Sequence, residues 1–514
     1  MHRNPTLYLL VASTWLISSH APVHAGTITV PGDHATIQDA IDAAVDGDIV
    51  LVAPGLYFEN LVLAEKSITL RGSEDSVSTI INGGQRDATL RITGEGSSPT
   101  IENLYLTGGF AHPDGQLAVT GGAIVCVDAD PVIRNNSIAG NVEAFAVDSA
   151  GLAIHLEHSN AQIEGNTISC NRADHGAVRV VGSSHCIFRD NEYYENLLGG
   201  ALDVVDSVVL LEGERFGGNV ADSGAAIRLR DSTAVIRSCE LFSNDAVGTR
   251  GSGGAVWAVD SAITLENCLL YGNTCTLSGG AIFATSASVV PGTTPCSIRH
   301  STFVDNEAAE TGGALALFIS PTLVEHSILW SNDAPTNAQI AGTVAARYCD
   351  VQGGFSGPGV IAADPLFAAG SSGGFPLSQV SAGQSSDSPC VDAGDPSVAP
   401  FDGTTSTNGA PDTGVVDLGF HAASRSTFVR TDCNDDGLVD VADPIFHQSY
   451  LFLGGPGPSC RDACDSNDDG YLDIADAVTT LAHLFSGGTP PAPYLDCGTD
   501  PTVDTLSCVE SSCP

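Results

Sequence analysis

Residues 253–283 read GGAVWAVDSAITLENCLLYGNTCTLSGGAIF and span one period of a repeat that fills the middle of the chain. A Gly-Gly-Ala-aliphatic motif opens this period and the next one, and Asn273 lies between the two motifs. The first and third residues after the alanine are apolar in each period, which is the alternation of a strand with one buried face. Equivalent asparagines recur every 23 to 33 residues, at Asn141, Asn171, Asn196, Asn219, Asn244, Asn273, Asn306 and Asn332.

This self-similarity, with no helical periodicity between the motifs, is typical of a solenoid whose coils stack on one another. We therefore predict an all-β fold, a right-handed parallel β-helix, over most of the chain. Stacked asparagine side chains can hydrogen-bond from coil to coil. We also expect these asparagines to adopt the left-handed backbone conformation at the corner of each coil.

A strict alternation of charge indicates how the coils stack. Seven residues before each asparagine stands a charged residue whose sign reverses from one period to the next: Arg134, Glu164, Arg189, Glu212, Arg237, Glu266, Arg299 and Glu325. Parallel strands lie about 4.8 Å apart, and like charges directly opposite one another are unfavourable at that distance. The alternation therefore predicts stacking in register, with each charge between two opposite charges.

The flanking segments predict how the solenoid begins and ends. Residues 35–44, ATIQDAIDAA, place Ile37, Ala40, Ile41 and Ala44 on one face of an amphipathic helix. A helix there would cover the open apolar end of the solenoid. We assign residues 26–110 to this cap and the first coils, 111–345 to the repeated coils, and 346–428 to closing coils and a linker.

Charge and the N-terminal segment indicate an exported protein. The net charge of −42 argues against nucleic acid and anionic lipid as partners. Residues 1–25 are typical of a signal peptide, with Arg3 before an apolar core and Val23-His24-Ala25 as the cleavage site. The apolar core is too short to span a membrane, and no later stretch reaches that length. We therefore predict a secreted, extracellular or cell-surface protein.

Fifteen cysteines then lie in a compartment that permits disulfides. Because fifteen is odd, at least one is free or pairs between chains. Cys239 and Cys268 occupy the same position in adjacent coils and could stack or bridge, and a bridge between Cys349 and Cys390 would join the closing coils. The sequence leaves the remaining pairings open.

Two loops near the C-terminus carry the pattern of calcium-binding loops. Residues 432–443 read DCNDDGLVDVAD and residues 465–476 read DSNDDGYLDIAD. Both have oxygen-bearing side chains at positions 1, 3, 5, 9 and 12 and glycine at position 6, where the loop turns sharply. An apolar segment that ends in Gly-Gly follows each loop, as expected of a helix C-terminus. The pattern predicts two bound Ca²⁺ ions in a small helical module, residues 429–514.

Two resemblances to known families concern the solenoid. The GGA(I/L/V) motif followed by segments such as FSN (242–244) and FVDN (303–306) resembles the repeat of polymorphic outer-membrane proteins. Residues 35–44 and the segment after them resemble the opening of pectin-lyase-like β-helix proteins. Both resemblances imply the parallel β-helix. The outer-membrane family normally ends in a β-barrel, whereas this chain ends in calcium loops and cysteines.

The tandem arrangement of loop and helix, with Asp at position 12, resembles type I dockerin. The resemblance implies a cohesin-like or cell-surface protein as partner. At loop positions 10 and 11, which read cohesin and are often Ser or Thr, this chain has Val441-Ala442 and Ile474-Ala475. Six cysteines and a Pro-rich tail also frame the module. The implied calcium ligands, with position 7 contributing its backbone carbonyl, are Asp432, Asn434, Asp436, Leu438, Asp440 and Asp443, and Asp465, Asn467, Asp469, Tyr471, Asp473 and Asp476.

One outer row of the solenoid is a candidate glycan-binding face. Arginines there could bind carboxylates or sulfates of an acidic glycan, and aromatic rings offer flat faces to sugars. The glycan-binding candidates are His155, Arg179, Arg228, Arg230, Trp257 and Phe283. The weak catalytic candidates are Glu157 and Asp203, which are expected two coils and roughly 10 Å apart, at or beyond the limit for an inverting acid pair. A plain solvated face is the alternative to both.

Three functions are therefore open. The first is a secreted calcium-binding protein that is docked through its dockerin-like module and acts in adhesion or glycan binding. The second is a polysaccharide lyase or glycoside hydrolase docked by the same module. The third is a structural component of the cell surface. The sequence favours a binder or a structural component over an enzyme, because no clustered acids stand out on one face.

Overall fold

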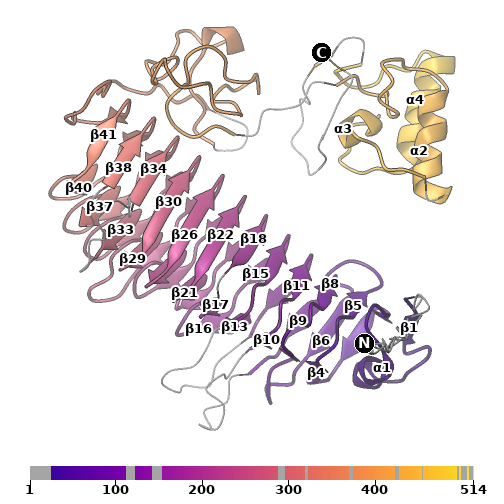
Figure 1. Cartoon of the computed structure of the whole chain (residues 1–514). Helices are drawn as coiled ribbons and strands as arrows, with labels where there is room; N and C mark the ends of the chain where they lie inside the picture. Colours follow the sequence, from indigo (N-terminus) through magenta and orange to yellow (C-terminus); the bar gives the residue numbers. More distant parts are fainter. Residues whose placement is uncertain are drawn as a thin grey trace, which may run out of the picture.

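The computed structural model describes residues 25–110, 122–141, 153–183, 185–286, 296–318, 322–369, 374–422, 428–453, 455–494, 497–498, 506, 508 and 513. Except for Ala25, the predicted signal peptide lies outside these residues. The described chain contains three long sheets of 13, 12 and 11 strands, whose strands follow one another coil by coil. The strands of each sheet pair in parallel, so the predicted parallel β-helix is confirmed (Figure 1).

The strands of the three sheets are short, at two to five residues each. The first sheet consists of β1 (Thr27–Val30), β2 (Ile49–Val52), β5 (Thr69–Gly72), β8 (Thr100–Glu102), β11 (Val132–Arg134), β14 (Gln162–Glu164), β18 (Cys186–Arg189), β22 (Val208–Glu212), β26 (Thr233–Arg237), β30 (Ala262–Glu266), β34 (Cys296–Arg299), β38 (Thr322–Glu325) and β41 (Ala345–Arg347). The second consists of β3 (Gly55–Tyr57), β6 (Thr79–Asn82), β9 (Tyr105–Thr107), β12 (Ser137–Ala139), β15 (Thr167–Ser169), β19 (Glu192–Tyr194), β23 (Arg215–Gly217), β27 (Glu240–Phe242), β31 (Leu269–Tyr271), β35 (Thr302–Val304), β39 (Ile328–Trp330) and β42 (Asp350–Val351). The third consists of β4 (Leu61–Ala64), β7 (Leu90–Thr93), β10 (Ile124–Val127), β13 (Ile154–Glu157), β17 (Val178–Val181), β21 (Leu202–Val205), β25 (Ile227–Arg230), β29 (Val256–Val259), β33 (Ile282–Thr285), β37 (Leu315–Phe318) and β40 (Ile340–Gly342).

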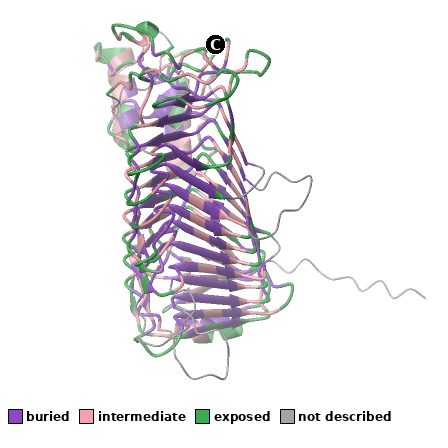
Figure 2. Cartoon of the chain, turned by 90° about the vertical axis from the view of Figure 1, so that its left-hand side faces the viewer, coloured by how far each residue is buried: buried purple, intermediate pink, exposed green. Residues whose placement is uncertain are grey.

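Shorter strands lie in the chain between strands of the second sheet and strands of the third, and they pair with one another. They are β16 (Arg172–Ala173) and β20 (Leu197–Leu198) in one pair, and β24 (Val220–Ala221), β28 (Asp245–Ala246), β32 (Thr274–Cys275) and β36 (Glu307–Ala308) in a four-stranded sheet. Inward-facing residues of the three long sheets, such as Ile154 and Leu156, have no exposed surface. The buried residues line the interior along the whole solenoid, as Figure 2 shows.

The alternating charges stack in register on the first sheet, as the sequence predicts. Glu212, for example, lies opposite Arg189 on β18 and Arg237 on β26. The alternation also continues beyond the eight predicted positions, because Arg71 and Glu102 precede it and Arg347 follows it. Eleven coils therefore share one charge ladder.

The corner asparagines also form a continuous ladder. The Nδ2 of Asn171 donates to Oδ1 of Asn196 at 3.1 Å, and Asn196 donates in the same way to Asn219 at 3.0 Å. The expected left-handed conformation is wrong for these residues. The residue before each asparagine adopts it, as Cys170 does with φ 54°. The preceding residue makes the turn, while the buried asparagine reaches the next coil.

The predicted N-terminal helix forms as α1 (Ile37–Ala43). Its predicted apolar face is buried in the solenoid core. The carboxylate of Glu59 accepts the backbone N–H groups of Ile37 and Gln38 at 2.9 and 3.0 Å. At the other end, Nζ of Lys66 donates to three carbonyls, those of Ile41, Asp42 and Ala44, at 2.7 to 2.9 Å. Lys66 is the only lysine in the chain, and its charge lies where the helix dipole is negative.

The segment 374–422 packs against the turns that connect strands of the first sheet to strands of the second. It includes a short 3-10 helix, η1 (Val380–Ala382). The backbone N–H of His421 donates to Oδ1 of Asn267 at 2.7 Å.

The possible bridge between Cys349 and Cys390 is not formed, and both residues are free thiols. Cys390 Sγ donates to Asp350, while Cys349 Sγ donates to backbone carbonyls. Cys239 and Cys268 are also free thiols.

The C-terminal module contains α2 (Ala442–Leu453), α3 (Arg461–Cys464) and α4 (Ile474–Ser486). The two longer helices pack against each other (Figure 1). Disulfides join Cys433 to Cys464, Cys460 to Cys508 and Cys497 to Cys513. Among the described residues, no helix combines the length and apolar character needed to cross a membrane.

Candidate functional sites

The third sheet brings the predicted glycan-binding residues into two adjacent rows on one face. His155, Arg179, Asp203 and Arg228 lie opposite one another on successive strands from β13 to β25. Trp257 and Phe283 continue the row on β29 and β33. Arg230 and Glu157 belong to the adjacent row, two residues further along their strands.

Asp203 is the centre of a cationic cluster in this row. Its side chain has no exposed surface, and Nε of Arg228 donates to Oδ1 at 2.8 Å. Nη2 of Arg230 lies 3.1 Å from Oδ2, and Nε of Arg179 lies 3.5 Å from the same oxygen. Three guanidinium groups thus surround one carboxylate, in a chain whose net charge is strongly negative. The cluster has surplus positive charge on a face of an otherwise acidic protein.

The burial of two residues in this row differs from the expectation of an outward row. His155 is only 3% exposed and Asp203 is fully buried. Nε2 of His155 lies 3.6 Å from Oε2 of Glu157. The nearby His155 ring lowers the pKa of Glu157, and burial lowers the pKa of His155.

This geometry gives the acid pair little support. The pKa of Glu157 is shifted away from the raised value that a general acid needs at neutral pH. Both oxygens of Asp203 are engaged by arginines and neither faces solvent. The face is better suited to binding an anion than to transferring a proton.

The aromatic end of the row is more extensive than the two predicted rings. Trp257 and Phe283 are half-buried, and the ring of Phe318 lies 6.0 Å from that of Phe283 between centroids. The side chain of Phe318 is half exposed. Phe318 occupies the row of Glu157 and Arg230, so extending that row by three coils would have found it in the sequence.

The two predicted calcium loops have the same backbone arrangement. In the first, Asp432 accepts the N–H of Gly437 at 3.0 Å and Asp443 accepts those of Asn434 and Asp440 at 3.2 and 2.8 Å. The second loop repeats these bonds, with Asp465 accepting from Gly470 at 2.8 Å and Asp476 from Asn467 and Asp473. Gly437 and Gly470 have φ of 83° and 81°, a conformation that glycine adopts without strain.

The chemistry of these loops fits a hard divalent cation. Asp443 and Asp476 are fully buried, and burial raises their pKa to about 6 and about 7. Buried carboxylates are costly unless a cation compensates them, and Ca²⁺ prefers such oxygen ligands. Leu438 and Tyr471 at position 7 point their side chains to solvent, which leaves only a backbone carbonyl to contribute. Calcium binding itself stays a prediction.

An exposed apolar surface repeats on the two helices of the module. Val441, Ile445 and Phe452 are exposed on the first repeat, at 50, 62 and 65%. Ile474, Val478 and Phe485, each 33 residues later, are exposed at 48, 57 and 73%. Of these six residues, only Val441 and Ile474 belong to loop positions 10 and 11 of the dockerin-like repeats. The helical spacing of the other four could have revealed them.

Comparisons with known proteins agree on the solenoid. Residues 152–332 match the family model described as "Right handed beta helix region". A 228-residue stretch is 27% identical to probable outer membrane protein pmp6 of Chlamydia pneumoniae and covers 37% of this chain and 17% of that protein. Another, of 164 residues, is 29% identical to metabotropic glutamate receptor-like protein P of Dictyostelium discoideum and covers 32% and 11%. The chain spans less than a fifth of the length of these curated relatives.

Similar solved structures include two carbohydrate-active enzymes. An alginate lyase from Paenibacillus sp. str. FPU-7 is 16% identical with a TM-score of 0.31, and 62% of this chain and 99% of that chain are covered. Pectate lyase Pel9A is 11% identical with a TM-score of 0.33, and 76% and 96% are covered. At these values the solved structures bear on no more than the fold. The family model supports the predicted right-handed parallel β-helix.

Proposed function

We propose that this chain is a secreted β-helix protein that binds an extracellular polysaccharide on its third sheet and docks through its calcium-binding module. The observation that carries the glycan proposal is the cluster of Arg179, Arg228 and Arg230 around Asp203. An acidic glycan offers carboxylates or sulfates, which arginine binds in a bidentate manner. Arg230, at 37% exposure, has the most accessible side chain of the three.

The aromatic side chains extend the proposed binding strip along the solenoid. Trp257 lies one coil beyond Arg228, and Phe283 and Phe318 follow at the next two coils. Coils repeat about every 4.8 Å, a spacing close to the length of one sugar unit in an extended chain. A polymer running along the solenoid axis would therefore meet charged groups first and rings afterwards.

The docking proposal concerns residues 429–514. By the dockerin resemblance, two Ca²⁺ ions would be held by the oxygen-bearing residues of the two loops, and the ions would fix the helices that follow. The exposed apolar residues of α2 and α4 support a protein partner, since apolar patches of this kind are typical of interaction sites. The partner would be a cohesin-like or cell-surface protein with a complementary apolar surface.

At the opposite end of the chain, we propose that α1 closes the open core of the solenoid.

A polysaccharide lyase is the second candidate function, and the same cationic cluster favours it. Guanidinium groups that neutralise a uronate carboxylate would make the neighbouring carbon acid easier to deprotonate. His175 could accept that proton, because burial lowers its pKa and Arg179, Arg228 and Arg230 lie near enough to contribute to its electrostatics. A glycoside hydrolase would need the acid pair, which the surroundings of Glu157 and Asp203 do not favour. A purely structural surface component would need neither residues for binding nor residues for catalysis.

The experiment that tests this proposal uses the secreted chain from residue 26 and a panel of acidic and neutral polysaccharides. We would measure three readouts in parallel: pull-down of intact polymer, new reducing ends, and the ultraviolet absorbance of unsaturated products. We expect retention of an acidic polymer without cleavage. Unsaturated products would instead identify a lyase. No signal in any of the three assays would favour the structural role over binding and catalysis.

Matched variants locate the binding face. Arg230→Gln and Trp257→Ala should each weaken retention of the acidic polymer about tenfold or more. Arg215→Gln is the control, because Arg215 is a comparably exposed arginine on the second sheet and forms ion pairs with Glu192 and Glu240. Equal losses from Arg215→Gln and Arg230→Gln would show that retention reflects general charge and not this face.

A further inference from the structure

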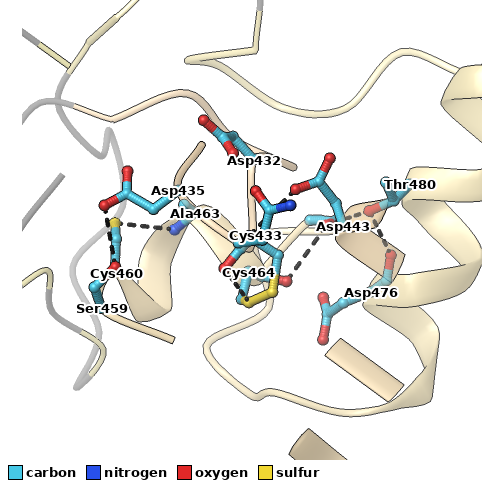
Figure 3. The surroundings of a disulfide bond; sticks show 12 residues. Asp432, Cys433, Asp435, Asp443, Ser459, Cys460, Ala463, Cys464, Asp476 and Thr480 are labelled. Atoms are coloured by element: carbon cyan, nitrogen blue, oxygen red, sulfur yellow. Dashed lines mark hydrogen bonds between the residues drawn. A yellow bond between two sulfur atoms is a disulfide. The ribbon is translucent and has the colours of Figure 1, made fainter. Parts of the chain in front are cut away.

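A cluster of sulfur and nitrogen atoms lies between the two loops of the C-terminal module. Cys433 belongs to the first loop, His447 to α2, and Cys464 is the last residue of α3. One possible ligand atom from each residue lies within 4.8 Å of the other two. All three residues are buried. Figure 3 shows the disulfide that joins the two cysteines, with the loop carboxylates of Asp443 and Asp476 around it.

His447 is the second observation at this cluster. The residue is 1% exposed, and its Nε2 atom has no hydrogen-bond partner among the residues that the structure describes. A buried polar atom without a partner carries a desolvation cost. Imidazole nitrogen is also a common metal ligand.

We propose that Cys433, Cys464 and His447 form a binding site for a soft divalent metal ion of the Zn²⁺ type when the two cysteines are reduced. In tetrahedral coordination with metal–sulfur distances of about 2.3 Å and metal–nitrogen distances of about 2.0 Å, ligand atoms lie roughly 3.5–3.8 Å apart. The ligand atoms of the three residues lie within 4.8 Å of one another. The two sulfur atoms are bonded in the oxidised chain and would have to move apart to that separation once the disulfide is reduced. Two thiolates and one imidazole fill three positions and leave the fourth to water.

The exchange between the two states is balanced. A dithiol reductant gives two electrons and two protons to the Cys433–Cys464 bond, which breaks into two thiols while the reductant becomes a disulfide. Binding of M²⁺ then releases the two thiol protons, and the metal keeps its oxidation state. A disulfide oxidant reverses the exchange by re-forming the Cys433–Cys464 bond and releasing the metal.

The site differs in chemistry from the calcium loops beside it. Sulfur and nitrogen ligands favour soft or borderline ions, whereas the loop carboxylates favour Ca²⁺. Either the disulfide or the metal would join the first loop to the end of α3, and the metal would add α2 through His447. The module would thus have a cross-link both in a reducing compartment, where disulfides are rare, and after export, where they persist.

The test uses the full secreted chain, with Ca²⁺ kept saturating so that the loops are not the variable. The chain is reduced, freed of reductant under nitrogen, and titrated with Co²⁺ as the spectroscopic probe. We expect one equivalent of Co²⁺ to give a thiolate charge-transfer band that Zn²⁺ abolishes. The oxidised chain should give no band.

Variants decide whether these residues are the ligands. His447→Asn, similar in size and uncharged, should weaken Co²⁺ affinity about tenfold or more and shift the visible bands, while Cys433→Ser should abolish the charge-transfer band. Cys460→Ser, which removes the neighbouring disulfide, should leave the band unchanged. A reduced chain without a band, or a band that His447→Asn and Cys433→Ser both leave unaltered, would overturn the proposal. If Cys433→Ser does not fold, the His447→Asn titration alone decides.

Discussion

Glu214 accepts a hydrogen bond from the side chain of Asn191, at a coil position where the three preceding coils carry asparagine. The Nδ2 atom of Asn191 lies 3.1 and 3.2 Å from the two carboxyl oxygens, and its backbone N–H lies 3.1 Å from one of them. Asn136, Asn166 and Asn191 form the same contact in succession. Glu214 has no exposed surface, and its burial raises the pKa to about 8.

The stability of the solenoid should therefore fall as pH rises through neutrality. Glu214 is protonated in the folded state up to about pH 8, whereas the unfolded carboxyl ionises near 4.5. The contribution of Glu214 to the free energy of unfolding is present in full below pH 4.5, falls as pH rises from 4.5 to 8, and levels off above 8. The total is about 4–5 kcal/mol at ~1.4 kcal/mol for each pKa unit.

Glu214→Gln should remove this dependence, because glutamine accepts from Asn191 without ionising. We expect its melting temperature at pH 8 to exceed that of the unmodified chain, with little difference at pH 4.5. Glu212→Gln, on the exposed charge ladder two residues earlier, is the control and should not change the slope. Parallel melting curves for Glu214→Gln and the unmodified chain from pH 5 to 8 would contradict the assignment.

The charge ladder should be sensitive to a single reversal of sign. Glu212 pairs with Arg189 at 3.1 Å and with Arg237 at 3.8 Å, so Glu212→Arg places three arginines on adjacent strands. These side chains are 33–49% exposed and solvent screens them, so we expect a loss of only about 1–2 kcal/mol. The melting temperature should drop by a few degrees.

A variant with the same change in net charge but no ladder partner provides the comparison. Glu74→Arg alters an exposed residue outside the strands and should leave the melting temperature within about a degree. High salt should also reduce the difference between Glu212→Arg and the unmodified chain, because it screens exposed charges. If the two variants melt alike at low salt, the ladder contributes nothing to stability.

The sequence was sufficient to predict the solenoid because its signals are local and periodic. Each signal can be found by comparing one coil with the next. Examples are the spacing of Asn171, Asn196 and Asn219 and the opposite signs of Arg189 and Glu212. The ladder members Arg71, Glu102 and Arg347 were missed because their coils lack the repeated asparagine motif. The preceding residue, and not the asparagine, makes each corner, which spacing alone does not distinguish.

Features that depend on long-range packing could not be predicted in this way. Asn267 contacts His421 across 154 residues of sequence, and no periodic signal connects them. Asp203 is fully buried, with arginines of the two neighbouring coils around its carboxylate, so an outward position on a strand did not imply exposure. The calcium loops are the opposite case, since every proposed ligand lies within twelve consecutive residues.

Acid should loosen the segment 374–422 before the rest of the solenoid. The rings of His300 and His326 stack with centroids 4.8 Å apart, and His421 and Phe401 of this segment pack against His300. Burial lowers the pKa of His300 to about 3, so the ring is neutral in the folded state and must gain a proton in acid. The contribution of the neutral His300 ring to stability is complete above pH 6.5 and is lost as pH falls from 6.5 towards 3.

Hydrogen exchange at pH 7 and pH 4.5, corrected for intrinsic rates, measures this effect. We expect protection in residues 374–422 to fall at least tenfold more than in β22 to β30. His300→Phe keeps an aromatic ring in the stack and should reduce the acid effect, whereas His158→Asn, which changes an exposed histidine, should not. Uniform loss of protection along the solenoid would refute a local response.

Replacing Lys66 should destabilise the N-terminal end. Lys66→Met keeps the length of the side chain but leaves the carbonyls of Ile41, Asp42 and Ala44 without their donor. We expect a loss of about 1–3 kcal/mol, visible as faster hydrogen exchange in residues 37–52. Lys66→Arg should retain most of the stability because it keeps a charged donor. Equal exchange in the Met and Arg variants would show that the lysine does not hold α1.

Calcium should stabilise the C-terminal module through both loops. We expect calorimetry on the full secreted chain to give two Ca²⁺ ions per chain and a melting temperature of the module that rises with calcium concentration. Asp443→Ala removes the position-12 carboxylate of the first loop and should reduce the stoichiometry to one. Asp435→Asn changes position 4 of the same loop, which accepts from Ser459 and is not a predicted ligand, so it should keep two. If Asp443→Ala and Asp435→Asn bind alike, or if the unmodified chain releases no heat with calcium, the loops do not hold the ion as proposed.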